Sequence, residues 1–403
     1  MQYPSKNRDQ IARTEAEMLR LIRVKNGLSQ AQIARQLELA PSTVGLYVDR
    51  LKNEGFLREG GKQKVEGRGR PARNLVVAPR AGSFVGVDVT KRFVRMIKMD
   101  FAEKVRQEQR EEIEPEGSFA RVLEKVMALA QSGPSAGPLL GAGVAVPSSV
   151  PIDEPGRGRR HHLRDWDFDA LDGAFEEEFS IRARRDNSHR AMAAAELWFG
   201  AGRDVDNFVS LSARTGIGAT LVLGGEPLEG TTRKAGNIGY WSCPKGLLPP
   251  SSCRYLEPGK RGEDPTLAEL CSIPGLLERV EESLERCTDS VLNETGGAVL
   301  FGDLLRARRT GDELAVAHTD SAAIGLGWAA ARLAELVDPE LFVVSGPVLS
   351  LGEDFVQTLS RTLTVQFGPD GRQPPPVVAS ELGEYAGAMG AAAVALHHWT
   401  PER

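Results

Sequence analysis

The 403-residue chain lacks the features of secreted and membrane-spanning proteins. It holds four cysteines, none of them in a CxxC pair: Cys243, Cys253, Cys271 and Cys287. So few, widely spaced cysteines argue against a disulfide framework and fit a reducing cytoplasm. The first residues are polar, unlike a signal peptide, and no apolar run reaches the roughly 18 residues that a membrane span needs. We therefore expect a cytoplasmic protein without a membrane partner, and a buried core helix at 322–331.

Acidic residues are scarce in one part of the chain only. Residues 1–80 carry 16 Lys and Arg against 8 Asp and Glu, a balance of +8. The remaining residues carry 34 against 47, a balance of −13. A basic N-terminal segment on an acidic body indicates contact with nucleic acid at the basic end.

A helix-turn-helix pattern occupies the basic segment. An amphipathic helix is expected over 13–25, and a second follows Ser29, which can form a capping box with Gln32. Ser42 is expected to cap a third helix, which Gly55 ends. The residues expected to approach base edges lie near the start of this third helix: Ser42, Thr43, Gly45, Leu46 and Tyr47.

A glycine- and arginine-rich turn follows. Strand-like residues 56–58 and 74–77 flank the segment EGGKQKVEGRGRPAR, which has the composition of a winged hairpin's turn. Glycine lets the backbone lie close to a minor groove, whose negative potential favours arginine. By composition alone the run GRGRPAR equally suits a solvated linker. Next to a helix-turn-helix it favours DNA contact through Arg68, Arg70 and Arg73.

Beyond Gly82 the pattern changes to alternating strands and helices. Apolar strands are expected at 83–89, 93–100 and 141–147, and a helix at 119–130. The alternation continues to the C-terminus, which argues for an α/β body.

Six stretches of this body resemble the ROK family, which groups sugar kinases with sugar-responsive repressors on an actin-like ATPase fold. They are VGVDV at 85–89, GAGVAVP at 141–147, LSARTGIGATLVLGG at 211–225, KAGNIGY at 234–240, IGLGWAAARLAELVDPELFVVSGPV at 324–348 and GAMGAAAVAL at 387–396. The resemblance covers residues 80–398 and depends on the order and spacing of the stretches. With the winged helix, it implies the repressor branch, of the xylose- and N-acetylglucosamine-repressor type.

The resemblance also implies a domain organisation. An N-terminal winged helix-turn-helix (1–80) precedes a two-lobed, actin-like α/β body. Its first lobe comprises 81–198 and 386–403, and its second lobe comprises 199–385.

The family's nucleotide-binding loops are only partly retained. Where the kinases carry Asp followed by a Gly-Gly-Thr turn, this chain keeps Asp88 but has Thr90 and Lys91 in place of the glycines. The second, glycine-rich hairpin is kept as TGIGA at 215–219, although Arg214 replaces the usual glycine before it. The resemblance therefore implies weak or absent ATP binding, and we expect no cofactor.

The family's sugar pocket is altered at four of five matched positions. The catalytic Asp, which takes the proton from the attacking sugar hydroxyl, aligns with Ser188. A serine hydroxyl cannot serve as that general base without an activating partner, so no catalytic residue is expected. The other matched positions are His162, Asn237, Tyr240 and Glu257. These polar residues suit a carbohydrate site; either the pocket takes a different small molecule as effector or it is vestigial.

Zinc is not expected, although many family members hold it with one histidine and three cysteines. Tyr240 replaces that histidine, and no histidine lies between residues 190 and 317. Only Cys243 and Cys253 remain as candidate ligands, and a tetrahedral site needs four.

Three functions stay open at this point. The first is a DNA-binding regulator, expected to repress carbohydrate-related genes, whose catalytically dead body forms a homodimer or tetramer on an inverted-repeat operator and senses a sugar-like effector. The second is an ATP-dependent sugar kinase with a DNA-binding appendage, which needs a substitute carboxylate such as Asp186. The third is a regulator governed by a protein partner.

Overall fold

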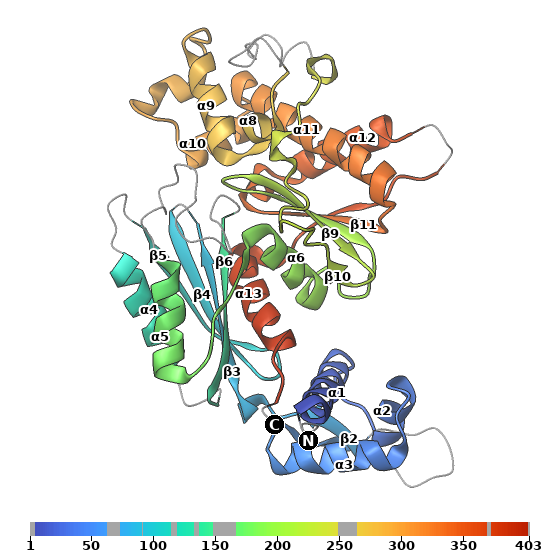
Figure 1. Cartoon of the computed structure of the whole chain (residues 1–403). Helices are drawn as coiled ribbons and strands as arrows, with labels where there is room; N and C mark the ends of the chain where they lie inside the picture. Colours follow the sequence, from blue (N-terminus) through green and yellow to red (C-terminus); the bar gives the residue numbers. More distant parts are fainter. Residues whose placement is uncertain are drawn as a thin grey trace. The chain divides into compact units, whose positions relative to one another are not determined.

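The structure is a computed structural model and describes residues 5–62, 73–90, 92–113, 119–132, 137–147, 167–248, 264–368 and 372–401. The chain forms two compact units: Met1–Asp186 with Gly387–Arg403, and Asn187–Ala386. The described strands form two sheets in the first unit and one in the second (Figure 1). Each unit also has its own apolar core. Among the described helices, none is long and apolar enough to cross a membrane.

The first unit begins with a winged helix-turn-helix. Its elements are α1 (Ser5–Val24), α2 (Gln30–Gln36), α3 (Pro41–Asn53), β1 (Leu57–Lys62) and β2 (Arg73–Val77). The two strands pair antiparallel and form the hairpin that was expected from the sequence. We call these residues the head.

Two of the expected helix signals can be compared with the head's geometry. The capping box is confirmed, because the Ser29 and Gln32 side chains each bond the backbone of the other residue. The expectation that Ser42 caps α3 is wrong: the helix begins at Pro41, and its N-cap residue Ala40 makes no side-chain cap bond. Proline suits the first helical position because its φ is already helical and its missing N–H would have no partner there.

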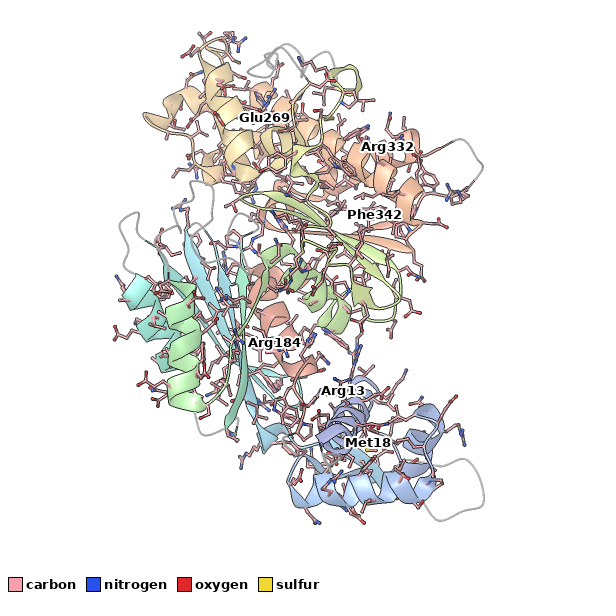
Figure 2. All side chains as sticks on the ribbon, viewed as in Figure 1. Arg13, Met18, Arg184, Glu269, Arg332 and Phe342 are labelled. Atoms are coloured by element: carbon pink, nitrogen blue, oxygen red, sulfur yellow. The ribbon has the colours of Figure 1, made fainter. Side chains whose placement is uncertain are left out.

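The head's core lies between the three helices and the hairpin. Val44, Val48 and Leu51 of α3 are fully buried, as are Ile33 of α2 and Met18 of α1. Figure 2 labels Met18 on α1. Because the buried residues of α3 recur at helical spacing, its opposite face is left toward solvent.

The rest of the first unit, the first lobe, is a mixed sheet in the order β5-β4-β3-β6-β7. Its strands are β3 (Ser83–Val89), β4 (Phe93–Asp100), β5 (Val105–Glu112), β6 (Leu139–Val146) and β7 (Arg184–Asn187). Helices α4 (Phe119–Gln131) and α5 (Phe168–Phe179) cover one face, and α13 (Ala386–His397) lies against the other (Figure 1). A Cβ at Gly86 or Gly143 would lie 1.9 Å from a backbone oxygen of α13, so both glycines permit this close packing.

The second unit contains a sheet in the order β10-β9-β8-β11-β12. Its strands are β8 (Phe208–Ala213), β9 (Ile217–Leu223), β10 (Glu226–Pro227), β11 (Leu341–Ser345) and β12 (Val377–Ala379). Its helices are α6 (Ser188–Phe199), α8 (Leu267–Cys271), α9 (Ile273–Leu284), α10 (Phe301–Arg309), α11 (Glu313–Val337) and α12 (Glu353–Gln366).

Alternate residues of this second sheet belong to two different cores. Phe208 and Val343 pack with Ala193 and Leu197 of α6. Their neighbours Val209, Leu211, Phe342 and Val344 pack with residues of α8, α11 and α12, and Figure 2 labels Phe342 on β11. The alternation follows from the two-residue period of a strand. The expected core helix at 322–331 is confirmed as part of α11, in which those residues are largely buried.

The division between the two units differs at one helix from the expected lobe limits. The first unit ends at Asp186, whereas the first lobe was expected to run to residue 198. Helix α6 belongs to the second unit because its Ala193 and Leu197 pack on β8, β9 and β11.

Candidate functional site

The exposed face of α3 carries the residues that were expected to approach DNA bases. Ser42 is exposed, and Thr43, Gly45 and Tyr47 are partly exposed. Leu46 is 65% exposed, the highest value for a large apolar residue among the described residues of the head.

A buried ion pair behind this face involves two residues that the sequence analysis did not select. Arg50 Nε lies 2.6 Å from Glu15 Oε1 of α1. The Glu15 side chain is fully buried and that of Arg50 is 32% exposed. The Arg50 guanidinium carbon is also 5.3 Å from the centroid of the Tyr47 ring, a cation–π separation. Thus Glu15 of α1 positions the Arg50 side chain by an ion pair, and Arg50 contacts the Tyr47 ring on the α3 face. In the sequence, a glutamate within the apolar periodicity of α1 was the available signal.

The wing residues lie mostly beyond what the structure describes. Arg68 and Arg70 fall outside the described residues. The backbone of Arg73 begins β2 and pairs with Lys62 of β1. The wing's contribution to DNA contact stays a prediction.

The expected effector residue Ser188 is the first residue of α6 and is only 7% exposed. Asn187 caps this helix, since its side chain accepts a hydrogen bond of 2.8 Å from the His189 N–H. The His189 ring bonds the Ser212 hydroxyl of β8 and packs on Gly218 of β9, where a Cβ would lie 2.5 Å from it. Here the histidine ring accounts for the glycine of the GIG hairpin, with no need to invoke a phosphate.

The loop that carries Asn237 and Tyr240 packs against the next residue of β9. Gly236 has φ 78°, a conformation that favours glycine, and a Cβ there would lie 1.5 Å from the Ala219 carbonyl oxygen. Asn237 is exposed, and Tyr240 is 68% exposed. The start of α6 and this loop therefore meet at Gly218–Ala219, with two of the expected polar side chains directed to solvent.

Arg190 forms a second connection between α6 and the loop. Its side chain is buried, and Nη1 donates a hydrogen bond of 2.8 Å to the Arg233 carbonyl. Sequence reasoning missed this residue; its signal was one charged side chain within the alanine-rich stretch SHRAMAAA. The remaining expected pocket residues, His162 and Glu257, lie outside the described residues.

The two stretches that were expected to match the family's phosphate loops carry Thr90 and Arg214 in place of glycines. At the end of β3 the Thr90 hydroxyl donates a hydrogen bond of 2.7 Å to the Phe93 carbonyl and accepts one of 3.0 Å from the Phe93 N–H. Lys91 lies outside the described residues. At the second loop, Arg214 carries a long side chain at the turn from β8 to β9, and its backbone bonds Gly216 and Ile273.

The described residues contain no group of three or more His, Cys, Asp or Glu side chains that could hold a metal ion. Cys243 and Cys271 are buried free thiols. Burial raises the pKa of the Cys243 thiol to about 12. Cys253 lies outside the described residues.

Comparison with known proteins bears on both parts of the chain. The model of the ROK family matches residues 84–398. The chain belongs to the ROK family. A model of the winged helix-turn-helix DNA-binding type matches residues 12–58, which span α1, α2 and α3.

Several members of this family resemble the chain. A putative xylose repressor from Caldicellulosiruptor sp. (strain Rt8B.4) is 26% identical over 346 residues, which are 83% of each chain. A glucokinase from Halalkalibacterium halodurans is 27% identical over 258 residues, 62% of this chain and 74% of its own. The crystal structure of a ROK family transcriptional regulator, a homologue of the E. coli MLC protein, matches with TM-score 0.76 and 21% identity over 96% of each chain.

The match that includes the head distinguishes regulators from kinases within the family. The glucokinase aligns with only part of the chain, whereas the winged helix-turn-helix model matches the head. The protein is a ROK family transcriptional regulator with an N-terminal DNA-binding winged helix-turn-helix.

Proposed function

We propose that the protein represses carbohydrate-related genes in the cytoplasm by binding an inverted-repeat operator as a homodimer or tetramer. The observation that carries this proposal is the composition of the α3 face: exposed Leu46 beside partly exposed Thr43 and Tyr47, on a helix whose other face is the head's core. Such a helix fits the major groove. There, threonine methyl groups and apolar side chains contact the thymine methyl group, and side-chain hydroxyls form hydrogen bonds with base edges. Two heads reading two half-sites multiply the affinity of one.

The second unit is the proposed effector-binding part. Ser188 at the start of α6, with Asn237 and Tyr240 on the adjoining loop, supplies hydroxyl and amide groups of the kind that bind sugars. Arg190, which ties α6 to that loop, belongs to the same proposal. An effector that binds one conformation of the body better than another shifts the population of DNA-binding molecules by that difference in affinity.

Sugar kinase activity is not part of the proposal. A kinase of this family needs a carboxylate to take the sugar proton, and position 188 holds a buried serine. It also needs a glycine turn open to phosphate, and Thr90 closes the turn after β3 with two hydrogen bonds to Phe93. Asp186 at the end of β7 is the nearest carboxylate in sequence and is the residue that a kinase interpretation would require.

Selection of genomic DNA fragments on the full-length protein tests the operator proposal. Selection at near-physiological salt suppresses binding that depends on phosphate contacts alone. We expect enrichment of sites that share an inverted repeat, beside genes of sugar uptake or use. Enrichment without any inverted repeat, or none at any salt, would refute binding as a paired assembly.

A pair of leucine substitutions separates the α3 face from the rest of the surface. Leu46→Glu puts a carboxylate where bases or phosphates would lie, and we expect selected sites to bind at least about fivefold more weakly, since one lost contact costs about 1–3 kcal/mol. Leu336→Glu is the matched control, because Leu336 of α11 is 75% exposed and lies in the second unit. With an unchanged oligomeric state, it should bind as the wild type does. Equal binding by both variants would remove α3 from the interface.

The effector proposal has its own test. A thermal-shift screen with sugars and sugar phosphates should reveal a compound that stabilises the protein and changes its affinity for the selected operator. Ser188→Leu should abolish that shift while operator affinity without the compound stays unchanged. No stabilisation by any compound would favour control by a protein partner instead.

A further inference from the structure

Three aromatic rings from separate parts of the chain meet where the head adjoins the first lobe. Phe56 precedes β1, Phe101 follows β4, and Trp399 follows α13. The Phe101 ring centroid is 5.4 Å from that of Phe56 and 5.3 Å from that of Trp399, and Phe56 is 5.1 Å from Trp399. Rings attract at these separations. We call Phe56, Phe101 and Trp399 the junction cluster.

A buried arginine of the head joins this cluster. Arg23, in the last turn of α1, donates a hydrogen bond of 3.0 Å from Nε to the Phe101 carbonyl. Its guanidinium carbon lies 4.7 Å from the centroid of the Phe101 ring, and the residue is 8% exposed. Burial lowers the pKa of Arg23 to about 10, against the opposing effect of the Glu103 carboxylate, so the side chain remains charged at neutral pH. A buried charge is tolerated only while its partners stay in place, so Arg23 favours one docked position of the head.

The backbone between head and lobe is short and bonded on both sides. Only residues 78–82 separate β2 from β3. The Ala78 N–H donates to the Phe56 carbonyl at 2.9 Å, and the Phe101 N–H donates to the Pro79 carbonyl at 3.3 Å. These bonds attach the connection to Phe56 in the head and to Phe101 in the lobe.

Helix α13 anchors the third ring in the sheet of the first lobe. The close approach of α13 at Gly86 and Gly143 holds the helix against β3 and β6. At its C-terminal end, His397 Nε2 lies 3.1 Å from Glu103 Oε1. Trp399 therefore extends from a helix that is fixed at both ends within the same unit.

We infer that Arg23 and Trp399 are positioning residues for operator binding, which hold the head in one orientation on the first lobe through the junction cluster. This inference rests on the proposed binding of paired half-sites. Two heads that are fixed in an oligomer present their α3 helices at one separation. Because B-DNA turns once in about 10–10.5 base pairs, adding one or two base pairs rotates the second half-site away from a fixed head. A head that is not fixed on the lobe can reorient toward the rotated half-site. It then loses conformational entropy each time that it binds.

Operators with altered half-site spacing test the inference. Duplexes carry two copies of the selected half-site, with the separation changed one base pair at a time, and a further duplex carries one copy. The full-length wild type is compared with Trp399→Ala, with Arg23→Leu, and with the control Trp328→Ala. Trp328 of α11 forms a T-shaped pair with Trp241 at 6.3 Å in the second unit, so the control also loses an aromatic pair.

We expect the wild type and the control to lose at least about tenfold in affinity when the best spacing changes by two base pairs. Trp399→Ala and Arg23→Leu should bind all spacings within about threefold, below the wild-type optimum, with unchanged affinity for the single half-site. A sharp spacing optimum retained in both variants would overturn the inference.

Hydrogen exchange gives a second result that needs no DNA. The Phe101 amide of the lobe, which bonds the Pro79 carbonyl in the connection, should exchange at least about tenfold faster in the two junction variants than in the control. Unchanged exchange at this amide would also overturn the inference. If the wild type binds a duplex with two half-sites no more tightly than a duplex with one, the proposed binding of paired half-sites fails. The hydrogen-exchange experiment then still decides whether Arg23 and Trp399 fix the head on the first lobe.

Discussion

Replacement of Arg50 by methionine should destabilise the head, because it removes the ion-pair partner of the buried Glu15 carboxylate. Glu15 is fully buried, and Arg50 Nε is 2.6 Å from its Oε1. Removing one partner of a buried ion pair lowers the free energy of unfolding by about 3–5 kcal/mol, because the remaining charge stays buried without a partner. Since the Arg50 side chain is 32% exposed, water reaches part of the site. We therefore expect the lower end, about 3 kcal/mol.

The same reasoning predicts an unequal response of the two partners. Glu15→Gln leaves Arg50 free to turn toward water, and should cost only about 1 kcal/mol. The double variant with methionine at both positions should return to within about 1 kcal/mol of the wild type, since an apolar pair of similar volume replaces the ions without an unpaired charge.

Native-state hydrogen exchange at the Val48 and Leu51 amides of α3 measures the free-energy cost of each substitution within the head. This local measurement does not assume that both units unfold in a single two-state transition. An Arg50→Met cost below about 1 kcal/mol, or a double variant no more stable than Arg50→Met, would refute the role assigned to burial. The Arg50→Met variant should also bind the operator more weakly, because Tyr47 loses its cation–π partner.

Three further predictions concern the body. Burial lowers the pKa of His318 to about 3 and that of His397 to about 4; since the unfolded chain binds more protons below its histidine pKa of about 6.5, thermal stability should be full above that pH and fall as the pH drops toward 4. His318→Gln should flatten the pH dependence of the melting temperature, and an unchanged slope would contradict this. Gly143→Ala should cost about 1–3 kcal/mol by pressing a Cβ on α13, whereas Gly173→Ala on α5, with nothing within 4 Å, should be neutral or stabilising; equal melting temperatures would disprove the packing argument. Ser188→Asp should not restore ATP-dependent sugar phosphorylation, because Thr90 still closes the phosphate turn; measurable turnover would show that the loss of the base alone silenced the site.

Local sequence patterns predicted the elements of the head and several strands and helices of the body. The capping box of Ser29 and Gln32, the periodic burial of α3, the strands from residue 83 and the core helix within α11 all follow from short-range geometry. A helix face or a strand face is encoded in neighbouring residues. The start of α3 lies at Pro41 and not after a Ser42 cap, because proline suits the first helical position as well as serine suits the cap.

For the candidate site, sequence reasoning selected the α3 residues and the altered position 188. It did not select Glu15, Arg50 or Arg190. A buried charge is recognised by its partner, and Glu15 and Arg50 lie 35 residues apart. A single sequence contains nothing that pairs them.

The sequence by itself thus determined the kinds of parts: a winged helix-turn-helix and an α/β body of the ROK family. The tertiary structure alone decided which distant residues meet. Arg23 reaches a carbonyl 78 residues away, Phe56 of the head touches Trp399 near the C-terminus, and His189 explains Gly218. The physical reason is that hydrophobic periodicity specifies which face is buried, whereas the partner of each buried group depends on how the connected elements pack in space.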